Sequence, residues 1–189
     1  ALLDPEPPPL VYPGRFGSYG RDPRPLAEGL RLLAEREPDA AAKLELVIAG
    51  PLTEEEAALF SGGFAPARVR RVGALDRGRA LALQRAADAL LLVAQPRRSQ
   101  LANFKLFEYL AAGPPVLALA AGTEAGRIVA EAGGEAVRAD DPEAIAAALA
   151  RTARGELEPF GAEVRERYSY PGAAERMARV VEDAIARRG

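Results

Sequence analysis

Two short segments combine residue types that suit an anionic ligand. In the first, Gly14 and Arg15 end a short apolar run that begins at Leu10. Glycine lets the backbone approach a ligand closely, and the planar guanidinium of arginine donates paired hydrogen bonds to a phosphate. An exposed arginine in a turn after a strand is the alternative interpretation. Arg21 and Arg24 follow in the next stretch, as further basic candidates.

The second segment is residues 103–117, NFKLFEYLAAGPPVL. Asn103 suits a helix N-cap, and Lys105 would then lie in the first turn, where the helix dipole disfavours a cation. An anionic ligand at the start of the helix would explain that lysine. Glu108 lies one turn further along, and its carboxylate can accept hydrogen bonds from two vicinal sugar hydroxyls, such as those of a ribose. An amphipathic helix with a solvated lysine and glutamate is the alternative.

These segments belong to a chain in which strand-like and helix-like patterns alternate. Several of the apolar runs show no polar alternation, which is typical of strands covered on both faces. Alternation of such strands with helices predicts a Rossmann-like, doubly wound parallel sheet with helices on both faces, followed by C-terminal helices. Ligands of such folds bind at the carboxyl ends of the strands. We expect strands at 10–15, 44–49, 69–72, 89–94, 116–120 and 135–138, and helices at 25–37, 54–60, 76–87, 103–112, 124–132, 142–154 and 172–188.

Composition excludes several kinds of chemistry. The 189 residues include no cysteine and no histidine, so thiol nucleophiles, disulfides and the commonest metal ligands are absent. The net charge of -2 does not suggest nucleic-acid binding, and no apolar run has the length of a membrane span. Residues 1–9, with four prolines and two acidic residues, indicate a linker remnant before a single domain at 10–189. A cytoplasmic origin is the default expectation.

Residues 105–116 resemble the donor-site signature K-x-x-E-Y-x-A-x-G-x-P-V of group 1, family-4-like GT-B glycosyltransferases. The matching residues are Lys105, Glu108, Tyr109, Ala111, Gly113, Pro115 and Val116. Other segments similar to the family's landmarks follow in the family's order at 12–15, 46–50, 69–73, 84–93 and 128–134. The resemblance thus covers nearly the whole chain.

This resemblance implies the C-terminal, donor-binding half of a glycosyltransferase that uses a nucleoside diphosphate sugar and retains the anomeric configuration. It implies that Glu108 binds the ribose and that Arg15 and Lys105 neutralise the pyrophosphate, with Gly14 and the helix start at Asn103. The turn at Gly73 and Ala74 would border the base. No cofactor and no metal are implied, and the N-terminal acceptor-binding half would be a separate partner without which this chain is inactive.

The sequence departs from the family pattern at two places. Many relatives have a second glutamate, which contacts the donor sugar, eight residues before the ribose-binding one; Gln100 stands there. The family's second basic residue after the first strand has no clear match beyond Arg21 and Arg24, and Arg97 and Arg98 are further candidates for a phosphate contact.

Two other functions are weighed against the glycosyltransferase. A nicotinamide-dependent domain is disfavoured because no G-x-G-x-x-G follows the first strand. A non-catalytic, flavodoxin-like interaction or sensor domain would predict an acidic cluster or a phosphoacceptor aspartate at the strand ends, whereas Asp88 precedes its strand rather than following it.

Overall fold

The computed structural model describes residues 9–17, 20–94 and 104–186. Its centre is a six-stranded sheet in the order β3-β2-β1-β4-β5-β6, and every neighbouring pair of strands is parallel. The strand order reverses between β1 and β4, as in doubly wound folds. The predicted fold class is therefore confirmed. The strands are β1 (Pro9–Tyr12), β2 (Glu45–Ile48), β3 (Arg68–Arg71), β4 (Ala89–Val93), β5 (Val116–Leu119) and β6 (Glu135–Val137).

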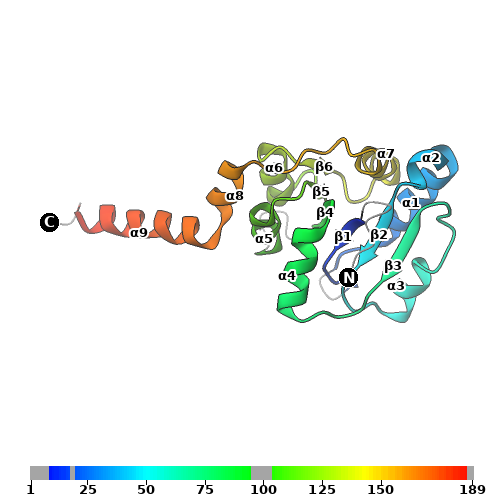
Figure 1. Ribbon diagram of the computed structural model, residues 1–189, viewed down its shortest axis with the longest axis horizontal. Helices are drawn as coiled ribbons and strands as arrows, with labels where there is room; N and C mark the ends of the chain where they lie inside the picture. Colours follow the sequence, from blue (N-terminus) through cyan, green and yellow to red (C-terminus); the bar gives the residue numbers. More distant parts are fainter. Residues whose placement is uncertain (1–8, 18–19, 95–103, 187–189) are drawn as a thin grey trace.

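Helices cover both faces of the sheet (Figure 1). The helices are α1 (Arg24–Arg36), α2 (Pro38–Ala41), α3 (Glu54–Leu59), α4 (Arg77–Ala86), α5 (Phe104–Ala112), α6 (Glu124–Glu131), α7 (Pro142–Ala153), α8 (Ala162–Tyr168) and α9 (Tyr170–Ala186). One apolar cluster joins α1, α3 and α7 to the sheet, and a second joins α4, α5 and α6 to the opposite face. All residues of β1, β2, β4 and β5 are buried, which explains their lack of polar alternation.

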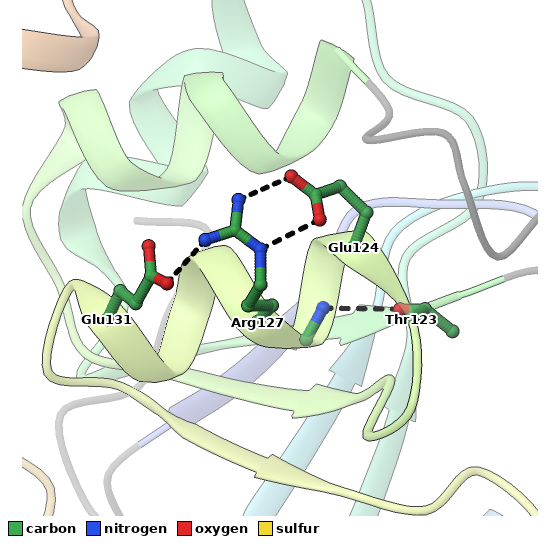
Figure 2. A network of polar contacts seen from close by, with 5 residues as sticks. Thr123, Glu124, Arg127 and Glu131 are labelled. Carbon is green, nitrogen blue, oxygen red and sulfur yellow. Dashed lines mark hydrogen bonds and ion pairs between the residues drawn. The ribbon is translucent and has the colours of Figure 1, made fainter.

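Side-chain caps fix where several helices begin. Thr53 forms a capping box with Glu56 at the start of α3, and Asp76 and Asp141 cap α4 and α7. Figure 2 shows the same device at α6, where the hydroxyl of Thr123 accepts a hydrogen bond from the amide of Gly126. These caps place the helix N-termini beside the carboxyl ends of the strands.

The C-terminal part differs most from the sequence-based expectation. Helix α8 was not expected; it packs on α5, where the rings of Tyr168 and Phe107 stack with centroids 5.8 Å apart. Helix α9 begins at Tyr170 rather than at residue 172 and extends away from the sheet (Figure 1). Its Met177, Val180 and Ile185 are 64%, 63% and 68% exposed. None of the helices in the described ranges is long and apolar enough to cross a membrane.

Candidate functional site

A cleft of about 220 Å³ opens at the carboxyl ends of the strands, next to the point where the strand order reverses. Loops after β1, β2 and β3 form one part of it, and α4 and α5 form the other. Its lining residues are Pro13, Gly14, Arg15, Ala49, Gly50, Pro51, Ala74, Leu75, Ala80, Gln84, Lys105 and Glu108. The cleft therefore has the position that doubly wound folds give to a ligand.

Five of the residues that the sequence singled out meet in this cleft. Its lining contains Gly14, Arg15, Ala74, Lys105 and Glu108, which come from three separate parts of the chain. Gly73 comes directly before Ala74 and has a positive φ of 71°, a conformation that favours glycine. The other candidates, Arg97, Arg98, Gln100 and Asn103, lie outside the described residues. Arg24 is not part of the lining and instead forms an ion pair of 2.7 Å with Asp22.

The loops after β1 and β2 touch through two glycines. A Cβ atom added to Gly50 would overlap the backbone of Gly14, chiefly its carbonyl oxygen. A Cβ on Gly14 would in turn lie 2.6 Å from the ring of Tyr12. Gly50 is thus required because the two backbones approach closely, and Gly14 is required because the Tyr12 ring lies against it.

Arg21 holds the loop that carries Arg15. Its Nε donates a hydrogen bond of 2.8 Å to the carbonyl of Val93 at the end of β4, and its Nη1 donates one of 3.0 Å to the carbonyl of Arg15. The hydroxyl of Tyr12 donates to the same Arg15 carbonyl at 2.9 Å. The Arg15 backbone is therefore fixed from two sides, while its side chain stays exposed.

A second anchor fixes the far side of that loop. The buried carboxylate of Glu56 accepts a hydrogen bond of 2.6 Å from the amide of Gly17 and another of 2.9 Å from the amide of Thr53. One glutamate thus completes the cap of α3 and attaches the loop after β1 to it.

Lys105 is half-buried in the first turn of α5, and its Nζ donates a hydrogen bond to the carbonyl of Pro13. Burial lowers the pKa of Lys105 below its ordinary value, and the positive charges of Arg21 and Arg15 lower it further, while Glu108 acts in the opposite direction. Two of these cations, Arg15 and Lys105, line the cleft. An anion bound there would relieve their repulsion.

Glu108 lies one turn after Lys105 on α5 and also faces the cleft, while Leu106, Tyr109 and Leu110 are buried against the sheet. Its carboxylate lies 3.5 Å from the guanidinium of Arg77, whose side chain is mostly exposed. Such exposed ion pairs contribute little to stability. The carboxylate therefore remains available to a ligand.

Sequence reasoning missed Gln84 and Arg77. Gln84 of α4 lines the cleft but is only 4% exposed. Its sequence context carries no clear signal, because α4 also contains three arginines and a further polar residue there is expected to face solvent. Arg77 could not be found, because only the packing of α4 against α5 brings it to Glu108.

The described residues contain no group of three or more histidine, cysteine, aspartate or glutamate side chains that could hold a metal ion. The polar groups that converge on the cleft are instead two cations, one carboxylate and one amide. Their chemistry is that of ligand binding through hydrogen bonds and charge.

Comparisons with known proteins agree with this picture. The family model described as "Glycosyl transferases group 1" matches residues 8–154. No curated protein sequence matches the chain.

Solved structures share the fold at low sequence identity. AviGT4, a glycosyltransferase involved in avilamycin A biosynthesis, is 22% identical with a TM-score of 0.60, over 94% of this chain and 51% of that one. The C-terminal domain of the group 1 protein LpcC from Francisella tularensis is 17% identical with a TM-score of 0.57, over 87% of this chain and 81% of that domain. HepE from Anabaena, in complex with UDP and glucose, is 14% identical with a TM-score of 0.60, over 93% of this chain and 48% of that one. The chain thus spans about half the length of AviGT4 and HepE.

Proposed function

The chain belongs to the group 1 glycosyltransferases, and on that basis we propose that it is the donor-binding domain of an enzyme that transfers a sugar from a nucleoside diphosphate sugar to an acceptor. The observation that carries the proposal is that Arg15, Lys105 and Glu108, which the sequence had singled out, line one cleft at the carboxyl ends of the strands. Cations and a carboxylate in one cleft suit a ligand with both phosphates and hydroxyls.

The cations would bind the pyrophosphate. Lys105 and Arg15 both line the cleft, and Arg21 fixes the loop that carries Arg15. Removing the donor sugar leaves a diphosphate with developing negative charge, which prearranged cations stabilise without reorganisation. We therefore propose transfer without a metal ion, and retention of the anomeric configuration follows the family resemblance.

Glu108 would bind the ribose. It lies one helical turn from Lys105, so a ligand whose pyrophosphate contacts Lys105 brings its ribose hydroxyls to the carboxylate. The exposed guanidinium of Arg77 lies 3.5 Å from the same carboxylate. Gly73 and Ala74 would border the base beyond the ribose. HepE, which holds UDP and glucose, has the same fold and supports a ligand of this class.

We propose that the acceptor-binding half is a separate domain of the intact enzyme. The support is that AviGT4 is about twice as long as the segment that matches this chain. The exposed apolar side chains of Met177, Val180 and Ile185 on α9 offer a surface for that half. The 189 residues alone should then catalyse no sugar transfer.

Calorimetric titration of the chain tests the proposal. We expect a nucleoside diphosphate to bind at least tenfold more tightly than the matching monophosphate, which corresponds to about 1.4 kcal/mol from the second phosphate. NAD is the control, because dinucleotide-binding domains share this strand order. Equal affinity for mono- and diphosphates, or a preference for NAD, would contradict the donor site.

A further inference from the structure

The most deeply buried polar side chain that lines the cleft is the amide of Gln84. Gln84 is 4% exposed, whereas Lys105 and Glu108 are only partly buried and Arg15 is exposed. Within the described part of the chain, the Oε1 atom of Gln84 has no hydrogen-bond partner. An amide that is buried without a partner destabilises a fold, so its presence needs a reason outside the packing of α4.

The neighbours of Gln84 in the cleft supply no such partner. Leu75 and Ala80 also line the cleft and are apolar. Ala80 precedes Gln84 by four residues, so the two side chains lie on the same face of α4. This wall, the α4 side of the cleft, therefore presents the apolar Ala80 and a single amide, which suits a flat, mostly apolar ring with polar edges.

The order of Lys105, Glu108 and α4 along the cleft indicates which part of a nucleotide would contact α4. In the proposed function, the phosphates lie at Lys105 and the ribose at Glu108. Glu108 in turn lies next to α4, because its carboxylate approaches Arg77 in the first turn of that helix. A nucleotide that runs from Lys105 past Glu108 therefore reaches α4 with its base.

We propose that Gln84 binds the nucleobase of the donor and contributes to the choice of base. This inference rests on the proposed function of the cleft. The side-chain amide both donates and accepts hydrogen bonds, so it can pair with an adjacent donor and acceptor on the edge of a base. Leu75 and Ala80 would contact the face of the same ring.

The test is a titration of the 189-residue chain and its Gln84→Leu variant with the four nucleoside diphosphates and their monophosphates. For the best-bound base, the variant should bind about five- to tenfold more weakly, the range for a lost neutral hydrogen bond. The loss of affinity should be equal for the monophosphate and the diphosphate. The difference in affinity between the best-bound base and the other bases should become smaller. Arg85→Gln, which alters an exposed neighbour on α4, is the control and should leave affinity unchanged.

Thermal unfolding without ligand separates a ligand contact from a structural role. Leucine replaces an unpaired buried amide with an apolar group, so the melting temperature of Gln84→Leu should stay the same or rise. A lower melting temperature with unchanged affinities, or a loss that is larger for diphosphates than for monophosphates, would overturn the inference. If the unaltered chain binds no nucleotide, the proposed function fails and this inference fails with it. If the unaltered chain binds diphosphates and Gln84→Leu binds each of them as tightly as the unaltered chain does, only the inference about Gln84 fails.

Discussion

Gly14 and Gly50, which follow two neighbouring strands, pack backbone against backbone. The carbonyl oxygen of Gly14 occupies the space that a Cβ atom of residue 50 would fill. The contact sets the separation of the loops after β1 and β2, and both glycines line the cleft. The shape of this wall therefore depends on the absence of side chains at residues 14 and 50.

Replacement of Gly50 tests this dependence. Gly50→Ala should lower the free energy of unfolding by about 1–3 kcal/mol, the usual cost of a side chain forced into a packed site. It should also weaken nucleoside diphosphate binding, because the loop with Arg15 must move. Gly62→Ala is the matched control, since a Cβ there meets nothing within 4 Å. Unchanged stability and affinity in Gly50→Ala would contradict the close contact.

Glu108→Gln tests the ribose contact. The variant should bind nucleoside diphosphates about 1–3 kcal/mol more weakly, because it removes hydrogen bonds to a charged acceptor. Its melting temperature should change little, since the ion pair with Arg77 is exposed. The control is Glu131→Gln, which removes an exposed helical carboxylate that pairs with Arg127 (Figure 2). A lower melting temperature with full affinity would make Glu108 a structural residue.

Lys105→Met tests the phosphate contact. Methionine keeps an unbranched apolar side chain in the half-buried site but removes the charge, so the diphosphate should lose more affinity than the monophosphate. Stability without ligand should change little. The variant loses the hydrogen bond to Pro13, but it also removes a buried cation that Arg15 and Arg21 repel. Equal losses for mono- and diphosphate in calorimetric titrations would argue against a pyrophosphate contact.

The lowered pKa of Lys105 predicts a pH dependence of stability. The unfolded chain keeps its proton up to the ordinary pKa of 10.5, whereas the folded chain releases it at lower pH. Between the lowered pKa and 10.5 the unfolded state binds more protons, so the contribution of Lys105 to stability rises with pH. The free energy of unfolding of the wild type, minus that of Lys105→Met, should therefore rise through this range. Denaturant titrations at several alkaline pH values measure it, and a constant difference would contradict the shift.

Arg21→Met separates the residue that fixes the loop from the residues that touch the ligand. The variant loses charge-assisted hydrogen bonds to the carbonyls of Val93 and Arg15, so stability should fall by about 1–3 kcal/mol and affinity should fall as well. Arg15→Met is the comparison, because its exposed side chain should affect affinity alone. Chemical denaturation measures the stability of both variants, and calorimetry measures their affinity for nucleoside diphosphates. If Arg21 contributes only charge, Arg21→Met will lose affinity without losing stability, as Arg15→Met should.

The sequence predicted β4 and β5 well because these strands are unbroken apolar runs. Residues 89–94 and 116–120 were expected as strands, and the structure has β4 at Ala89–Val93 and β5 at Val116–Leu119. The short helices α2 and α8 were missed. Helix α2 has four residues, too few to show a helical period, and α8 has no buried residue to mark one.

The sequence predicted site residues that break a local rule of helix formation. It did not predict residues whose role depends on contacts between distant segments. Lys105 was noticeable because a cation in a first helical turn opposes the dipole. The anchoring role of Arg21 depends on a carbonyl 72 residues away, and the partner of Gly17 is 39 residues away. Such contacts arise from the packing of the whole sheet, so no local pattern predicts them.

The packing of helix α9 predicts that this helix unfolds locally while the sheet stays folded. Its main contact among the described helices and strands is with α8, and its large apolar side chains Met177, Val180 and Ile185 face solvent. Because these side chains are not buried, the backbone hydrogen bonds of α9 can break without unfolding of the sheet. Amide protons of α9 should exchange with solvent through frequent local opening, whereas those of β1 and β4 exchange only when the whole domain unfolds. The same chain would therefore contain two regions of very different protection, with the boundary near Ser169.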